Sequence, residues 1–247
     1  MSVVSLSRGI VRHHQIEGPM GVASTREAPV TTVSGRTAIV TGGSLGVGVA
    51  AAKAIDAAGG NVVLIARSQE AADATAAEVG GNAVGMAARA VDQAAAQRCV
   101  DAAIERFGSI DILINTAGTN HARGRIIDQD YLRFTKTCGV TLWEPILWTS
   151  LVARAWMSEH GGVVVNTIGE TGSDAGLGLY AAANAALLSL TEQLAVELSP
   201  TVRVDAVVLD TAQSEYAGSA TAPAPSGEHD VGDAIVRLVS YSRRVGR

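Results

Sequence analysis

Short apolar runs alternate with helical stretches along most of the chain. Runs expected to form buried strands lie at 37–40, 61–66, 82–87, 110–115, 161–168 and 202–209. Helical periodicity predicts helices at 46–58, up to Val79, and at 92–107, 142–158, 177–198 and 230–241, with a broken helical region around 127–139. Continuous apolar strands alternating with helices indicate a parallel sheet covered on both faces. Right-handed crossovers then predict a doubly wound, three-layer α/β/α fold.

Residues 1–34 lack both clean alternation and a sustained helical period. They mix Ser, Thr, two prolines and scattered charges. This composition predicts an N-terminal arm that is disordered in part, followed by a single domain over 35–247.

Composition excludes several classes of protein. The chain has 247 residues with 47% hydrophobic residues, enough for a substantial core. Its 19 Lys+Arg against 24 Asp+Glu give a net charge of −5, and no basic run predicts nucleic-acid binding. Two cysteines are too few for a disulfide framework, which favours a reducing, cytoplasmic location. No apolar run reaches the roughly 18 residues of a membrane span.

The segment TGGSLGVG (41–48) joins the first predicted strand of the domain to its first helix. Gly42 allows a sharp turn, Gly46 lets backbone N–H groups approach a phosphate, and Gly48 lets the helix pack closely on the strand. The helix N-terminus then favours a pyrophosphate. The alternative is an ordinary tight turn. The predicted cofactor contacts in this segment are Thr41, Gly42, Ser44, Leu45, Gly46 and Gly48.

Arg67 follows the second strand of the domain, where an acidic residue would bind the ribose 2′-hydroxyl of NAD. An arginine there suits a 2′-phosphate, which favours NADP(H). The alternative is a solvated loop arginine.

The sequence resembles the short-chain dehydrogenase/reductase family. The resemblance covers roughly 36–211 and rests on TGGSLGVG, on NTAG (115–118) and on YAAANAA (180–186). It implies a Rossmann sheet with NADP or NAD across its carboxyl edge and hydride transfer between a carbinol and a carbonyl. The cofactor contacts that it adds are Asn115, Ala117, Gly118, Asn184 and Thr211.

The residues that carry the family's chemistry are only partly present. Tyr180 matches the family's general acid/base. The position of the family's lysine is occupied by Asn184, that of its serine by Gly169, and that of its asparagine by Thr141. Without a neighbouring ammonium group, the phenol of Tyr180 loses the positive charge that would stabilise phenolate.

Two other residues are candidates for replacing the missing groups. Glu170 follows Gly169 at the end of the fifth strand, and His121 follows NTAG in a segment that lines the substrate cleft in the family. Each is also consistent with a solvated surface residue. We expect no metal site.

Two departures concern the periphery of the domain. The Pro/Ala-rich connection at 221–227 predicts a reduced substrate lid, and no seventh strand is expected after the last helix. The three tryptophans fall in the long helix, which in this family often packs against its counterpart in a dimer.

Three functions remain open. The first is a non-redox cyclase, dehydratase or isomerase that acts on a small carbonyl or hydroxyl metabolite with Tyr180 as an acid or hydrogen-bond donor. The second is a silent subunit in a homo- or hetero-oligomer with an active homologue. The third is an atypical NADP-dependent ketoreductase or dehydrogenase. The expected cofactor is NADP(H), with binding that is weakened or lost.

Overall fold

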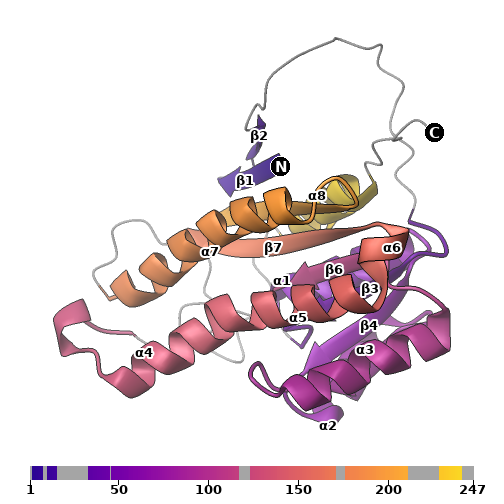
Figure 1. Cartoon of the computed structure of the whole chain (residues 1–247), viewed down its shortest axis with the longest axis horizontal. Helices are drawn as coiled ribbons and strands as arrows, with labels where there is room; N and C mark the ends of the chain where they lie inside the picture. The colour runs from indigo at the N-terminus through magenta and orange to yellow at the C-terminus, as the bar shows by residue number, and fades with distance from the viewer. Residues whose placement is uncertain are drawn as a thin grey trace.

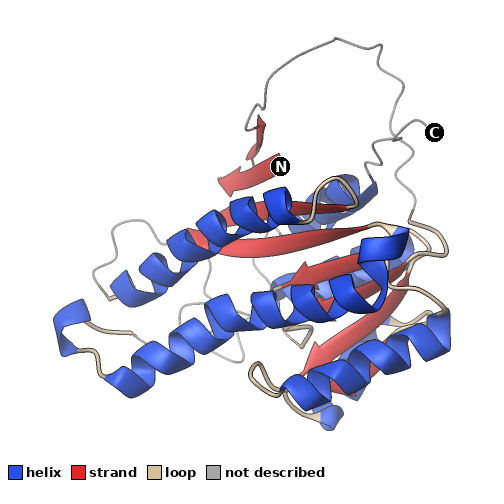
Figure 2. Cartoon of the chain, viewed as in Figure 1, coloured by secondary structure: helices blue, strands red, loops and turns tan. Residues whose placement is uncertain are grey.

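The computed structural model describes residues 2–7, 10–15, 33–44, 46–116, 123–170, 176–210 and 228–240. Within these ranges one eight-stranded sheet runs through the molecule in the order β2-β1-β8-β7-β6-β3-β4-β5. Its central strands lie between two layers of helices (Figures 1 and 2). The predicted doubly wound, three-layer fold is therefore confirmed.

The six strands of the domain are all parallel. Buried apolar side chains dominate them because helices cover both faces. Their bounds are β3 Thr37–Thr41, β4 Asn61–Ala66, β5 Val84–Ala87, β6 Ile112–Asn115, β7 Gly162–Glu170 and β8 Val202–Asp210.

Three buried apolar clusters fill the spaces between the sheet and the helices. One contains side chains of α1 and α8, and a second contains side chains of α3 and α5 (Glu144–Val152). A smaller third cluster contains Leu187 of α7 with Ile168 of β7 and Ala206 of β8. The helices are α1 Gly46–Ala57, α2 Gln69–Val79, α3 Gln93–Phe107, α7 Gly178–Glu197 and α8 Glu228–Ser240.

The long helix before β7 is interrupted by two π-helical segments. It consists of η2 Gly139–Trp143, α5 Glu144–Val152, η3 Ala153–Met157 and α6 Ser158–His160. The broken helical region before it is η1 Ile126–Asp128 and α4 Tyr131–Cys138. A π-helical turn shifts the faces of a helix, and such turns are frequent at functional sites.

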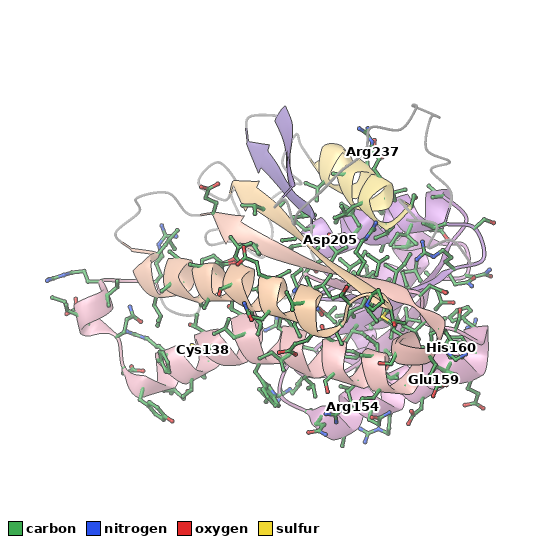
Figure 3. All side chains as sticks on the ribbon, turned by 45° about the horizontal axis from the view of Figure 1, so that its top comes forward. Cys138, Arg154, Glu159, His160, Asp205 and Arg237 are labelled. Carbon is green, nitrogen blue, oxygen red and sulfur yellow. The ribbon has the colours of Figure 1, made fainter. Side chains whose placement is uncertain are left out.

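Two arginines hold the C-terminal end of α8 against the sheet. Arg36 Nη1 donates to the carbonyl of Val239 at 2.8 Å, and Arg203 donates to the carbonyl of Leu238. Arg203 also pairs with the buried carboxylate of Asp205 at 2.8 Å. Figure 3 shows Asp205 on β8, next to the layer that contains α8. These contacts lie away from the carboxyl ends of the strands and have a structural role.

The first strands of the sheet come from the segment expected to be an arm. β1 (Ser2–Ser7) pairs parallel with β8, with Val3 opposite Ala206 and Leu6 opposite Leu209, and β2 (Ile10–Gln15) pairs antiparallel with β1. β1 thus lies beside β8, the sixth strand of the domain. The sequence pattern missed this strand because its pairing partner is some 200 residues further along the chain.

Candidate functional site

The candidate site begins where β3 and β6 end side by side. Thr41 and Asn115 are register partners at the carboxyl ends of these strands. The chain then turns through the glycine segment into α1, with Gly42 at φ 64° and Gly46 at φ 49°. Residues other than glycine rarely adopt this left-handed backbone conformation, so both glycines are needed for the turn.

Gly48 allows α1 to approach the strand ends closely. A Cβ atom on Gly48 would lie 2.6 Å from the carbonyl oxygen of Gly42 and 2.8 Å from Oγ1 of Thr116. Thr116 Oγ1 also donates to the carbonyl of Thr41 at 2.6 Å, a tie between the two strands that the sequence analysis missed. A close approach of this kind is what a dinucleotide-binding turn requires.

Two buried polar atoms at the same edge have no hydrogen-bond partner among the described residues. They are Oγ1 of Thr41 and Oδ1 of Asn115. The amide of Asn115 donates to Oδ1 of Asn166 at 2.8 Å, and the amide of Asn166 donates to Oγ1 of Thr191 at 2.9 Å. Buried polar atoms are nearly always satisfied, by protein, water or ligand. The edge therefore fits the polar groups of a dinucleotide.

Arg67 directly follows β4 on the same side of the sheet. Its side chain is exposed and makes no ion pair with any described residue. A free guanidinium in this position suits a phosphate group. Ser44 also lies in the described part of the turn, whereas the predicted contacts Leu45, Ala117, Gly118 and Thr211, with the catalytic candidate His121, lie outside the described residues.

Tyr180 lies in the first turn of α7 and is half-buried. Burial raises the pKa of its phenol above the ordinary value of 10.0, and a side-chain hydrogen bond with Asn184 only partly opposes this shift. No cation among the described residues lowers the pKa further. Tyr180 is therefore a neutral phenol at pH 7, able to donate a proton.

Both polar atoms of the Asn184 side chain make hydrogen bonds within the protein. Its side chain is buried, with Oδ1 accepting from the backbone N–H of Gly169 at 2.8 Å and Nδ2 donating to the carbonyl of Tyr180 at 2.9 Å. The amide thus joins the end of β7 to the first turn of α7. Its predicted role in cofactor binding stays a prediction, whereas its positioning of Tyr180 follows from these two hydrogen bonds.

The end of β7 carries the remaining catalytic candidates. Gly169 is half-buried and offers only backbone atoms, whereas Glu170 is exposed at the last position of the strand, opposite Asp210. The catalytic role of Glu170 stays a prediction.

The segment before α4 lies against the start of α7. The N–H of Gly124 donates to the carbonyl of Gly176 at 2.9 Å. A Cβ atom on Gly178 would lie 2.5 Å from Cδ1 of Ile126, so the isoleucine packs directly on the glycine. Because Gly178 is two residues before Tyr180, this segment borders the candidate active site.

Glu144 is a buried carboxyl group that the sequence analysis missed. It lies in α5 with 6% of its surface exposed, and burial raises its pKa from 4.5 to about 7. Three threonine hydroxyls of the same helical region, Thr137, Thr141 and Thr149, are buried without a hydrogen-bond partner among the described residues. Sequence alone could not reveal this group because an isolated Glu in a helix is ordinarily exposed.

Glu144→Gln is expected to stabilise the protein above neutral pH. Because the fold favours the protonated carboxyl, ionisation of Glu144 lowers the free energy of unfolding. The loss is absent near pH 4 and grows as the pH rises from 4.5 to about 7. Above that range the cost is constant at about 3 kcal/mol. Urea unfolding at pH 4.5 and pH 8 measures it: Glu144→Gln gains stability at pH 8 alone, and the exposed control Glu159→Gln gains none. Equal gains at both pH values would contradict the assignment.

Other kinds of site find no support in the described ranges. They contain no group of three or more His, Cys, Asp and Glu side chains arranged to hold a metal ion. They also contain no helix with the length and apolar character needed to cross a membrane.

Comparisons with known proteins agree with this geometry. The family model described as short chain dehydrogenase matches residues 36–223. A sorbitol dehydrogenase from Cereibacter sphaeroides is 34% identical over 169 residues, which are 67% of this chain and 66% of that protein, just under two thirds of its length. A Streptomyces violaceoruber protein named as a ketoacyl reductase of the granaticin polyketide synthase is 34% identical over 233 residues, 90% of this chain and 85% of that protein.

Solved structures show the same similarity. A 3-ketoacyl-(acyl-carrier-protein) reductase from Brucella melitensis, solved with NADH, has a TM-score of 0.67 and 29% identity, over 71% of this chain and 76% of that one. A short-chain dehydrogenase/reductase from Mycobacterium marinum has a TM-score of 0.68 and 27% identity, over 72% of this chain and 74% of that one.

Proposed function

This chain belongs to the short-chain dehydrogenase/reductase family, and on that premise we propose that it is an NADP(H)-dependent carbonyl reductase with Tyr180 as its proton donor. The observation that carries the proposal is the neutral, half-buried phenol of Tyr180 in the first turn of α7, held by Asn184. The similar proteins reported above are named as dehydrogenases or reductases, which favours the redox function over the non-redox and silent alternatives.

Carbonyl reduction needs a hydride for carbon and a proton for oxygen. A bound nicotinamide cofactor supplies the hydride. Tyr180 donates its phenolic proton to the carbonyl oxygen, and the C=O bond becomes a C–OH bond. A raised pKa keeps this proton in place at neutral pH. The reverse oxidation needs Tyr180 as phenolate, which burial disfavours.

Asn184 positions the donor. By accepting from Gly169 and donating to the carbonyl of Tyr180, it fixes the first turn of α7 relative to the end of β7. A positioned donor contributes through orientation as well as acidity. Gly169 provides no hydroxyl to stabilise the developing oxyanion, and one such donor is worth roughly 10²–10³ in rate. We therefore expect slow turnover compared with relatives that keep a serine there.

Support for the cofactor and substrate class comes from different sources. The glycine turn and the two unpartnered polar atoms at Thr41 and Asn115 fit a dinucleotide, and Arg67 favours the 2′-phosphate of NADP(H). Two of the similar proteins are named as ketoacyl reductases. We therefore take a ketone within an acyl or polyketide chain as the first substrate class to test.

The pH dependence of the two directions tests this proposal. Because the pKa of Tyr180 lies above 10, reduction with NADPH is expected to be nearly constant between pH 6 and 9. Oxidation of the product alcohol with NADP is expected to rise about tenfold per pH unit over the same range, following the fraction of phenolate. Initial rates in both directions measure this. An oxidation rate that levels off below pH 8 would mean that Tyr180 ionises readily and would contradict the proposed donor.

One specific observation supports a second, non-redox function. Asn184 and Gly169 occupy the positions of the family's lysine and serine. By this resemblance, the chain lacks two groups that support redox chemistry in the family. A non-redox isomerase or dehydratase needs only the hydrogen bond from Tyr180 to a substrate oxygen. The fate of the hydride separates the two functions.

A further inference from the structure

The first two strands of the chain extend the edge of the sheet that carries the candidate site. β1 runs parallel to β8 and lies beside its second half, from Val3 opposite Ala206 to Leu6 opposite Leu209. β7 and β8 are parallel as well, so β1 ends at the same edge of the sheet as they do. β1 and β2 lie side by side at one margin of the molecule (Figure 1). We call these two strands the N-terminal hairpin.

The closed end of the N-terminal hairpin lies at this carboxyl edge. Ser7 at the end of β1 is the register partner of Ile10 at the start of β2, so the chain reverses immediately beyond Leu6. Leu6 is level with Leu209, one residue before β8 ends at Asp210. The hairpin therefore reaches the edge of the sheet where the candidate site lies.

One row of backbone contacts connects the hairpin with Tyr180. The side chain of Asn184 donates to the carbonyl of Tyr180 and accepts from the backbone N–H of Gly169. Gly169 is the register partner of Leu209, and Leu209 is the register partner of Leu6. Neighbouring strands are about 4.8 Å apart, so the backbone of Leu6 lies about 10 Å from that of Gly169. The hairpin is thus two strands away from the position that holds Tyr180.

The order of the strands indicates which part of a bound complex lies nearest the hairpin. The unpartnered polar atoms that fit a dinucleotide lie on β3 and β6, and Tyr180 is held at the end of β7. β8 and β1 follow on the other side of β7. Ligands of open parallel sheets bind along the carboxyl ends of the strands. A dinucleotide over β3 and β6 therefore leaves the edge at β8 and β1 for the part of the substrate that extends beyond its carbonyl group.

The residue types at the closed end of the hairpin suit an aliphatic chain. Leu209, Leu6 and Val11 are register partners on β8, β1 and β2. They form the last row shared by the three strands before the carboxyl edge, and all three are aliphatic. A substrate chain that extends from Tyr180 towards β1 reaches this row. Each methylene group that is withdrawn from water contributes about fourfold in affinity.

We propose that the N-terminal hairpin forms the outer wall of the substrate site and gives the protein a preference for long aliphatic acyl chains over short ones. The inference rests on the proposed function for the position of the reacting carbonyl group at Tyr180. The match to the family model begins at residue 36, whereas β2 ends at Gln15. The wall is therefore built from residues outside the family match.

A proline in β1 tests this wall in the full chain. β1 pairs with β8 on one side and with β2 on the other, so Ser5→Pro removes a hydrogen-bond donor of the ladder and is expected to release the hairpin. Calorimetric titration with dodecanoyl and butanoyl pantetheine, which carry no ketone, measures binding without turnover. Ser5→Pro is expected to bind dodecanoyl pantetheine at least tenfold more weakly than the wild type, through the loss of two or more buried methylene groups, and butanoyl pantetheine equally well. Ser5→Ala keeps the backbone donor and is the matched control, expected to bind both probes like the wild type.

Two further variants keep the proposal testable if Ser5→Pro fails to fold, which circular dichroism shows. Leu6→Asn leaves the backbone pairing in place and is expected to weaken binding of dodecanoyl pantetheine alone, by about fourfold or more. Ser5 and Val208 are register partners, so Ser5→Cys with Val208→Cys is expected to form a disulfide and to bind dodecanoyl pantetheine within about twofold of the wild type. Ile10→Cys with Val208→Cys is the control and is expected to stay reduced, because β1 separates β2 from β8.

The outcomes separate the wall from the proposed reaction. A wild type that binds the two probes equally, or a folded Ser5→Pro or Leu6→Asn protein that loses affinity for both probes alike, overturns the proposal. A disulfide in the control pair alone overturns the position of the hairpin. If binding depends on the hairpin as expected but the β-ketododecanoyl and β-ketobutanoyl thioesters leave NADPH unoxidised, the wall is supported and the carbonyl reductase is wrong. Reduction of both thioesters with no effect of the hairpin on either rate or binding gives the opposite conclusion.

Discussion

Tyr180→Phe is expected to lower the rate of carbonyl reduction by about 10³-fold, because a positioned general acid contributes roughly 10²–10⁴. The substitution removes the phenolic O–H and leaves the ring in place. The Asn184 bridge uses the backbone carbonyl of Tyr180, so it is kept. NADPH affinity is therefore expected to stay within twofold of wild type. Single-turnover NADPH oxidation measures the rate, and fluorescence titration measures the affinity.

Tyr131→Phe is the matched control for this experiment. Because the side chain of Tyr131 is 80% exposed on α4, its hydroxyl is expected to contribute nothing to the rate. If Tyr180→Phe kept more than a tenth of the wild-type rate, another group would have to supply the proton. Glu170 and His121, the other two predicted catalytic residues, would then be the first to examine.

Gly48→Val is expected to weaken NADPH binding at least 100-fold, or about 2.7 kcal/mol. Its Cβ atom would lie 2.6 Å from the carbonyl oxygen of Gly42, which is backbone and cannot move aside cheaply. Relief of this contact displaces α1 or the glycine turn, and the dinucleotide loses the close approach that both provide. We expect NADPH to raise the melting temperature of the wild type and to leave that of Gly48→Val unchanged.

Gly139→Ala provides the comparison for Gly48→Val. A Cβ atom on Gly139 meets only Cγ1 of Val91 at 3.6 Å, an ordinary contact. This variant is expected to bind NADPH like the wild type. Tight binding by a folded Gly48→Val protein would show that the glycine turn is not the nucleotide site.

Local sequence patterns predicted most of the fold. Each of the six parallel strands of the domain is a short apolar run, and burial on both faces produces such runs without help from the rest of the chain. The glycine turn was also predictable, since the positive φ values of Gly42 and Gly46 need a residue type that can be recognised directly. β1 was not predictable because its pairing partner, β8, lies far away in the sequence.

Sequence motifs indicate the residues of the candidate site but not the contacts that the described ones make. Sequence identified Tyr180 and the replacement of a lysine by Asn184. The bridge from Asn184 to Gly169 depends on how closely α7 packs against β7, which no local pattern encodes. The raised pKa of Glu144 likewise depends on burial by surrounding elements.

The destination of the hydride tests the proposed carbonyl reductase most directly. The wild-type protein is incubated with NADPH deuterated at the transferring carbon and with a panel of β-ketoacyl thioesters and diketones, and the products are analysed by mass spectrometry. We predict one carbon-bound deuterium in the product alcohol, with one NADPH oxidised per product, and about 10³-fold less of this product from Tyr180→Phe in the same time. An isomerised or dehydrated product without deuterium, formed while NADPH remains reduced, would contradict the carbonyl reductase and establish the non-redox function.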